Sequence, residues 1–233
     1  MKIGVIVGSH RKDSESAKIG RFLCAQLATR ADVSTWTLDL GKTPLPLWDE
    51  ALWSDGPQWS GIPALKQELD ECDGFIMIAP EWHGMVPAAL KNFLLLWAAT
   101  GELSHKPALA TAVSAAEGGA YVIAELRMSS YKNNRLCWIP DHLIARQVKS
   151  ICNDDITAND DALQQPFAER ANYALDLLLA YGDALGGVRA SGVINHDAFM
   201  NGMYPVTASR PVRNRRQRVG GAGDAGTPHE SAR

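Results

Sequence analysis

Short apolar runs alternate with amphipathic stretches along most of this chain of 233 residues. The runs predict five strands, and the stretches beside them have the 3.6-residue period of helices. Strands that alternate with helices form right-handed βαβ units, which build an open parallel sheet. We therefore expect an α/β fold with a doubly wound, five-stranded parallel sheet in the order 2-1-3-4-5 and helices on both faces. The predicted strands lie at 3–7, 33–38, 74–79, 108–114 and within 136–148, and the predicted helices at 14–29, 62–71, 88–99, about 120–130 and 160–185.

Length and charge divide the chain into three parts. Residues 1–209 hold 17 basic and 24 acidic residues, a net charge of −7, whereas residues 210–233 hold six arginines and two acids, a net charge of +4. A glycine-rich stretch follows the arginines, and this composition is typical of a disordered tail. We expect one α/β domain at 1–185, an extension at 186–206 that contacts another subunit or forms a lid, and a disordered basic and glycine-rich tail at 207–233.

Composition excludes several classes of protein. The acidic body argues against nucleic-acid binding, although the basic tail leaves contact with RNA or acidic lipid open. No apolar run reaches 18 residues, so we expect no membrane span, and the N-terminal apolar run is too short for a signal peptide. The four cysteines form no C-x-x-C pair, which favours reduced thiols in the cytoplasm. The histidines show no metal-binding spacing, so we expect no metal.

The predicted topology brings three unusual loops together. In an open parallel sheet the ligand binds beyond the carboxyl ends of the strands, where the strand order reverses between strands 1 and 3. The segments 8–16, 80–87 and 114–119 follow the first, third and fourth predicted strands. We expect a ligand site where these three loops meet.

The first loop, G-S-H-R-K-D-S-E-S, has the composition of a phosphate site. A helix that begins near Ser14 offers unpaired N–H groups, and Ser9, Ser14 and Ser16 add hydroxyls. The guanidinium of Arg11 matches phosphate oxygens. These donors suit a terminal phosphate monoester, and no dinucleotide or triphosphate motif is present. The alternative is that Ser14 is only an N-cap and Arg11 a surface residue.

The second and third loops have the features of a ring-binding site. In P-E-W-H-G-M-V-P, Trp82 offers a flat surface beside an aromatic ring, and His83 a polar group at its edge. Alternatively, His83 is a hydrogen-bonded loop residue and Glu81 only an acid near a helix. S-A-A-E-G-G can expose backbone amides, or it is an ordinary turn capped by Ser114.

These loops carry a resemblance to a known family. Residues 8–16 resemble the pattern G-S-x-R-x-x-S-x-[NS], residues 80–92 resemble P-E-Y-N-G-x-x-P-x-x-L-K-N, and residues 45–50, L-P-L-W-D-E, are a weaker mark. The chain thus resembles the NADPH-dependent FMN reductase family, the flavodoxin-like group of FMN, azo, quinone and chromate reductases. The likeness covers about residues 1–185 and departs from the pattern at Trp82-His83.

The resemblance implies a site and an activity. By position, the FMN phosphate would be bound by Ser9, Arg11, Ser14 and Ser16. The flavin ring would lie along Pro80, Glu81, Trp82, His83 and Gly84, with Ser114, Glu117, Gly118 and Gly119 beside it. The implied activity is hydride transfer from NADPH or NADH through FMN to a small acceptor: a flavin, a quinone, an azo compound or a metal oxyanion. No catalytic side chain is implied, and His83 is a candidate proton donor only.

Two alternatives and one partner complete the predictions. A flavodoxin-type electron carrier, or an FMN-binding sensor without NADPH turnover, would share the fold and the cofactor. Arg11 and a pI near 6.1 argue against the carrier, because flavodoxins are usually strongly acidic. The helix at 88–99 is apolar around nearly its whole circumference, which indicates a homodimer or homotetramer unless the C-terminal segment covers it.

Overall fold

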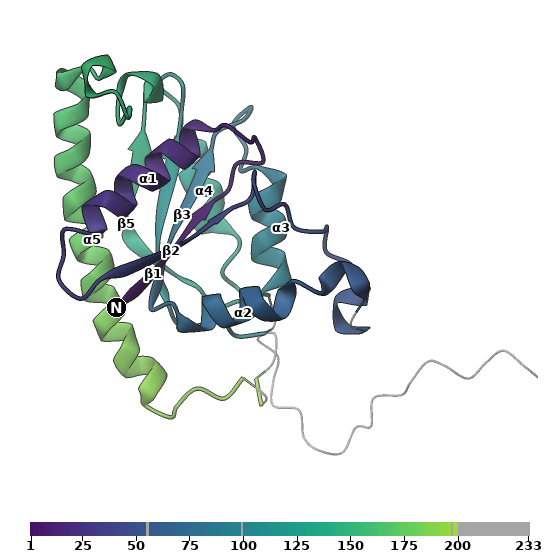
Figure 1. Cartoon of the computed structure of the whole chain (residues 1–233). Helices are drawn as coiled ribbons and strands as arrows, with labels where there is room; N and C mark the ends of the chain where they lie inside the picture. The colour runs from purple at the N-terminus through teal and green to yellow at the C-terminus, as the bar shows by residue number, and fades with distance from the viewer. Residues whose placement is uncertain (55, 99, 197, 200–233) are drawn as a thin grey trace, which may run out of the picture.

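The computed structural model describes residues 1–54, 56–98, 100–196 and 198–199. Within these residues, five parallel strands form one sheet in the order β2-β1-β3-β4-β5, drawn in Figure 1. This is the flavodoxin-like arrangement expected from the sequence. The strands are β1 (Lys2–Val7), β2 (Ser34–Asp39), β3 (Gly74–Pro80), β4 (Pro107–Val113) and β5 (Cys137–Ala145).

Helices cover both faces of the sheet because the central strands are apolar on both sides. Alternate residues of β3 point in opposite directions, so Phe75 and Met77 enter one core cluster and Ile76 and Ile78 the other. The first cluster packs under α2 (Ile62–Glu71), α3 (Ala88–Leu96) and α4 (Ala120–Met128). The second packs under α1 (Glu15–Leu27) and α5 (Asp161–Ala190).

The last helix, α5, is longer than the sequence predicted. The pattern predicted an end at residue 185, just before the glycine pair 186–187, but α5 continues to Ala190. The last turn is held from outside the helix, because Arg189 donates to the His105 carbonyl at 3.1 Å and pairs with Asp73 at 3.4 Å. Tertiary contacts therefore outweigh the low helix propensity of glycine.

The fifth strand tolerates Pro140 because it lies at the edge of the sheet. A proline lacks the N–H that a central strand would need, and an edge strand does not need it. The pairing with β4 is irregular between Ala108 and Ala110, opposite this region. Arg127 of α4 donates to the carbonyls of Ile139 and Asp141, so part of the exposed edge is covered.

The long loop after β2 covers α3. It forms two short 3₁₀ turns, Glu50–Ser54 and Pro57–Trp59, and packs Trp48 and Trp59 into the core. Asn92 of α3 holds the loop, since its amide nitrogen donates to the Pro46 carbonyl and its oxygen accepts from the Trp48 N–H, both at 2.8 Å. Two of the sequence marks, 45–50 and 80–92, are thus joined by one side chain.

This packing corrects the reason for expecting a subunit contact at α3. Its apolar residues Leu90, Phe93, Leu94 and Leu96, and Trp97 at its end, are buried in the chain's own core with residues of the sheet, the long loop and α4. Leu95, which is 49% exposed, is the large apolar residue of α3 left at the surface.

The described part of the C-terminal segment lies at the amino-terminal end of the sheet. The Ser104 hydroxyl is 3.0 Å from Nε2 of His196, and Arg135 donates to the Phe199 carbonyl at 3.1 Å. Figure 1 shows this end of the chain far from the loops that follow β1 and β3. The predicted tail at 207–233 lies outside the described residues, and the predicted role of 186–206 stays a prediction.

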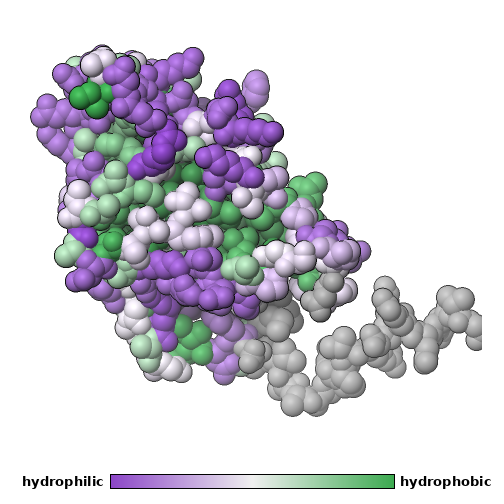
Figure 2. Space-filling model, viewed as in Figure 1, coloured by the Kyte–Doolittle hydropathy of each residue, from purple (hydrophilic) through white to green (hydrophobic). Residues whose placement is uncertain are grey.

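Figure 2 shows hydrophilic residues at the top of the molecule and in a band across its lower part, with apolar residues between them. In the part of the chain that the structure describes, no helix combines the length and hydrophobicity needed to cross a bilayer.

Candidate active site

The loop after β1 presents hydroxyls around the start of α1. Ser14 is the N-cap, with extended backbone, and its hydroxyl accepts from the Ala17 N–H at 3.1 Å. The Ser9 hydroxyl accepts from the Arg11 N–H at 3.2 Å and so tightens the turn. Ser16 is only 1% exposed, and its hydroxyl has no hydrogen-bond partner among the described residues. A buried polar atom of this kind is costly unless a ligand satisfies it.

The loop after β3 is a two-residue hairpin. The N–H of Trp82 donates to the Met85 carbonyl at 3.3 Å, and the N–H of Met85 returns a bond to Trp82 at 3.0 Å. The two central residues have positive φ, 52° at His83 and 75° at Gly84, as a type I′ turn requires. Glycine suits this backbone best, and histidine adopts it more readily than most residues.

The loop after β4 is folded by its own serine. The Ser114 hydroxyl accepts from the N–H groups of Ala116 and Gly118, at 3.3 and 3.1 Å. Gly119 then caps α4 with φ 106°, and a Cβ there would lie 2.4 Å from Ile144. The N–H of Gly119 donates to the Glu81 carboxylate, which ties this loop to the hairpin.

The loops meet around a pocket of about 200 Å³ at the carboxyl ends of the strands. The structure brings seven of the predicted residues to its wall: Ser9, Arg11, Ser14, Ser16, Pro80, Glu81 and Trp82. Six others lie outside the wall: His83, Gly84, Ser114, Glu117, Gly118 and Gly119. Four further residues that the sequence did not single out complete it: Glu15, Val113, Ala115 and Val148.

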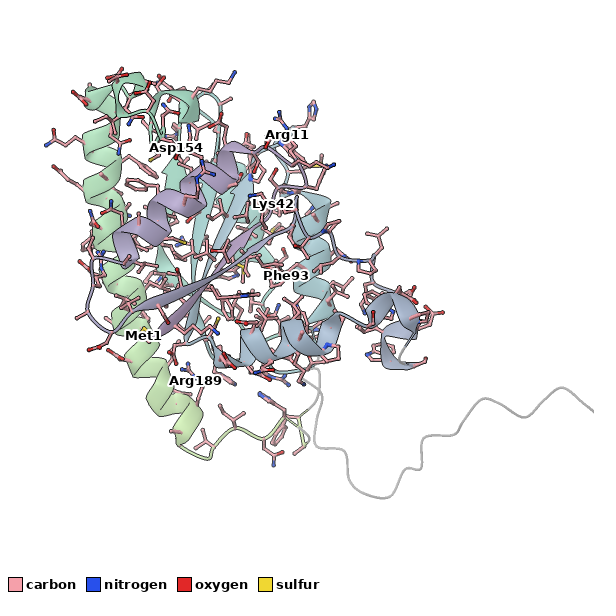
Figure 3. All side chains as sticks on the ribbon, in the orientation of Figure 1. Met1, Arg11, Lys42, Phe93, Asp154 and Arg189 are labelled. Atoms are coloured by element: carbon pink, nitrogen blue, oxygen red, sulfur yellow. The ribbon has the colours of Figure 1, made fainter. Side chains whose placement is uncertain are left out.

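Positive charge is concentrated beside the loop 8–16, which we call the phosphate-type loop because its composition suits a phosphate. The pocket continues into a wider hollow of about 430 Å³ whose wall includes Arg11, Lys12, Lys42 and Lys149. Within the described part of the chain, no hydrogen bond or ion pair holds the Arg11 guanidinium, so it is available to a ligand. Figure 3 shows Arg11 at the top of the sheet, above Lys42. Hydroxyls, helix N–H groups and one guanidinium suit a phosphate monoester.

Comparison with known proteins assigns the chain to a family. The family described as NADPH-dependent FMN reductase matches residues 1–149, which contain all three loops. The chain belongs to this family. Membership implies FMN and a nicotinamide donor, as the sequence resemblance also did.

Proteins similar in sequence to this chain include quinone and azo reductases. A 2-hydroxy-1,4-benzoquinone reductase of a Burkholderia species is 37% identical over 94 residues, 40% of this chain and 48% of that protein. An NADPH azoreductase of Bacillus sp. (strain OY1-2) is 26% identical over 130 residues, 55% of this chain and 68% of that protein. This chain spans about half the length of the first of these relatives and of two Pseudomonas putida quinone reductases.

Solved structures share the fold. The flavoenzyme NAD(P)H:(acceptor) oxidoreductase FerB from Paracoccus denitrificans aligns with a TM-score of 0.62 at 21% identity, over 79% of this chain and 97% of that chain. At this identity the likeness concerns the fold alone.

The structure accounts for two departures from the family's sequence pattern. His83 stands where the pattern has asparagine, at the left-handed turn position that both residues tolerate, and its ring is exposed outside the pocket. Trp82 lies on the pocket wall and contacts His10, whose ring centroid is 4.4 Å away at an angle of 78°. His10 lies in the first motif, but no sequence signal linked it to Trp82.

Proposed function

We propose that this protein is an NAD(P)H-dependent FMN oxidoreductase that reduces small acceptors, quinones or azo compounds. The observation that carries the proposal is the buried, unpartnered hydroxyl of Ser16 beside the free guanidinium of Arg11, in the phosphate-type loop of an FMN reductase family member. The similarity to a 2-hydroxy-1,4-benzoquinone reductase and to an NADPH azoreductase supports the acceptor class.

Each loop has a different task in this proposal. Ser9, Ser14, Ser16 and Arg11 hold the phosphate of FMN at the start of α1. Trp82 and Pro80 form the wall nearest the flavin ring, and Glu81 holds the hairpin against the third loop. FMN, when bound, supplies the hydride chemistry, so the protein needs no acid–base pair of its own.

The proton that a reduced quinone needs comes from solvent in this proposal. His83 is exposed at the tip of the hairpin and does not line the pocket, so the geometry gives it no direct path to a bound acceptor.

We also propose a homodimer or homotetramer, on the ground of exposed apolar side chains rather than the apolar circumference of α3. Four exposed apolar side chains lie on the hairpin, α3 and α4: Met85, Leu95, Tyr121 and Met128. The ion pair of Lys91 with Glu125 joins the two helices beneath this surface. A second copy of the chain would bury these side chains. Size-exclusion chromatography of the double variant Leu95→Lys/Met128→Lys beside the wild type tests this contact, and we expect the variant to elute as a smaller species.

The location also stays a prediction. The four cysteines are free thiols within the described residues, which supports a reducing compartment such as the cytoplasm.

The decisive experiment is an absorbance spectrum of the purified protein after FMN addition and desalting, then after anaerobic NADPH. A retained flavin band that bleaches supports a reductase, and a retained band that stays oxidised supports the electron carrier or the sensor. If no band is retained, an FMN titration distinguishes weak binding from none.

A further inference from the structure

The hairpin 81–86 is held to α4 at both of its ends. At its start, the Glu81 carboxylate accepts from the N–H of Gly119, the N-cap of α4. At its end, the Val86 N–H donates to Oε2 of Glu125 in the same helix, at 2.7 Å. The hairpin thus supplies one carboxylate to the backbone of α4, and α4 supplies the other to the backbone of the hairpin.

The hairpin needs such anchors because its own hydrogen bonds are few. Its internal backbone bonds are the single pair between Trp82 and Met85, and a two-stranded hairpin is marginal in water. It also holds His83 at φ 52°, a conformation that non-glycine residues disfavour. The bonds from Glu81 and Glu125 fix the backbone on both sides of that strained turn.

Glu125 is itself held in place. Its other oxygen, Oε1, pairs with Lys91 of α3, so Oε2 is left to face Val86. Burial raises the pKa of this carboxyl, but the Lys91 ammonium and the Val86 N–H outweigh burial and lower it. The carboxylate is therefore ionised near neutral pH, and a charged acceptor makes a stronger bond to an N–H than a neutral one.

We propose that Glu125 is a positioning residue for the reductase: through the Val86 N–H it sets the place of the hairpin and hence of Trp82 on the cofactor pocket. Glu125 itself is not part of the pocket wall. The proposal rests on the proposed function, because it assumes that Trp82 lies beside the flavin. Lys91 supports the carboxylate but does not contact the hairpin backbone itself.

Two conservative variants separate the hydrogen bond from the charge. Glu125→Gln keeps an oxygen that can accept from Val86 but loses the ion pair with Lys91. Glu125→Asp keeps the charge but shortens the side chain by one methylene, so the oxygen no longer reaches Val86. Glu169→Asp, on the exposed face of α5, is the matched control, since its carboxylate contacts only Gln165 among the described residues.

The readouts are chosen to detect position rather than stability alone. For each variant, hydrogen exchange of residues 82–86 is measured without FMN, and flavin visible circular dichroism, kcat and KM for NADPH are measured with FMN. We expect Glu125→Asp to speed exchange at the hairpin, change the flavin dichroism and lower kcat by about tenfold or more. We expect Glu125→Gln, which loses the charge and the ion pair but keeps an oxygen for the Val86 N–H, to change these quantities less than Glu125→Asp does, and Glu169→Asp to stay near the wild type.

The opposite pattern overturns the proposal. If Glu125→Gln is impaired while Glu125→Asp behaves like the wild type, the ion pair matters and the bond to Val86 does not. If both variants lower the melting temperature equally and leave the dichroism and kcat unchanged, Glu125 is structural only. A wild-type protein that fails to bind FMN would count against the proposed function. The hydrogen-exchange experiment without FMN would still test whether Glu125 fixes the hairpin.

Discussion

Two groups of polar side chains at opposite ends of the sheet differ in whether the chain itself supplies their hydrogen-bond partners. At the amino-terminal end, the buried ammonium of Lys106 donates to the carbonyls of Leu69 and Asp70, at 2.7 and 2.9 Å, and Arg189 joins α5 to Asp73 and the His105 carbonyl. At the carboxyl end, the Ser16 hydroxyl and the Arg11 guanidinium have no partner among the described residues. Figure 3 shows Arg11 and Arg189 at these opposite ends.

On the proposed function, this contrast separates residues that stabilise the fold from residues that bind the ligand. An unsatisfied buried hydroxyl destabilises a folded chain by about 1–3 kcal/mol. The Thr111 hydroxyl also has no hydrogen-bond partner among the described residues, but only the Ser16 hydroxyl belongs to a residue of the pocket wall. Substitutions at the amino-terminal end should therefore change stability, and substitutions at the carboxyl end should change FMN affinity. Five predictions test this division, from the largest expected effect to the smallest.

Arg11→Ala should weaken FMN binding by roughly 1.5–3 kcal/mol, because one charge-assisted bond to the phosphate is lost. The unfolding free energy without FMN should not change, since the side chain has no partner to lose. Fluorescence titration with FMN and urea unfolding measure the two quantities. Unchanged FMN affinity would remove Arg11 from the phosphate site.

Lys106→Met should lower the unfolding free energy by about 1–2 kcal/mol and leave FMN affinity unchanged. Two carbonyls at the end of α2 lose their donor, while the aliphatic stem is retained. Burial lowers the pKa of Lys106, so removing the ammonium also relieves a desolvation cost, which limits the loss. Urea unfolding beside the exposed control Lys132→Met tests this, and a matching loss in the control would contradict it.

Ser16→Ala should weaken FMN binding by about 1 kcal/mol and leave the FMN-free protein as stable as the wild type, or more so. The hydroxyl is unpaired without ligand, and alanine avoids its desolvation. Ser114→Ala is the contrasting variant, because that hydroxyl already accepts two N–H groups and should lower stability instead. Equal losses of stability in both would break the proposed division.

The amino-terminal end should make stability pH dependent. Burial, with the nearby His196, Arg135 and Arg189, lowers the pKa of His105. Since the folded pKa lies below the unfolded value of about 6.5, the unfolded state binds more protons in that window, and stability falls as pH drops through it.

Asparagine tolerates the φ of 55° at position 105, so His105→Asn should preserve the backbone there. The variant should reduce the slope of the unfolding free energy against pH. Part will remain, because burial also lowers the pKa of His142. Urea unfolding between about pH 5 and 7.5 measures it, and an identical slope in the variant would exclude His105 as a source.

His83→Asn should have the smallest effect, a change in stability of a few tenths of a kcal/mol in favour of the variant and no loss of kcat. Asparagine suits the left-handed turn at least as well as histidine. A loss of kcat with a quinone acceptor would instead make His83 the proton donor that the sequence allowed.

The fold, and the loops that surround the pocket, could be predicted from the sequence because their signals are local. Alternating strand and helix periods fixed the topology, and the serines and Arg11 follow directly from a strand that leads into a helix. The predicted topology also indicated that the loops after β1, β3 and β4 meet, and seven of the predicted residues line one pocket there.

The positions that were missed depend on contacts between distant segments. Val148 enters the pocket from the end of the fifth strand, and Glu125 reaches the hairpin across 39 positions. α5 passes a glycine pair because Arg189 finds partners on two other segments. A local sequence pattern does not predict contacts between segments that lie far apart in the chain.

The sequence by itself therefore determined the fold class and the family, and it supplied the hydroxyls and the guanidinium of the loop 8–16, since each depends on residue type and short-range period. Tertiary structure alone decided that His83 lies outside the pocket wall, that α3 buries its apolar residues in the core, and that α4 holds the hairpin. The physical reason is that side-chain direction, burial and long-range hydrogen bonds are set by which elements pack together, and packing is a property of the whole chain.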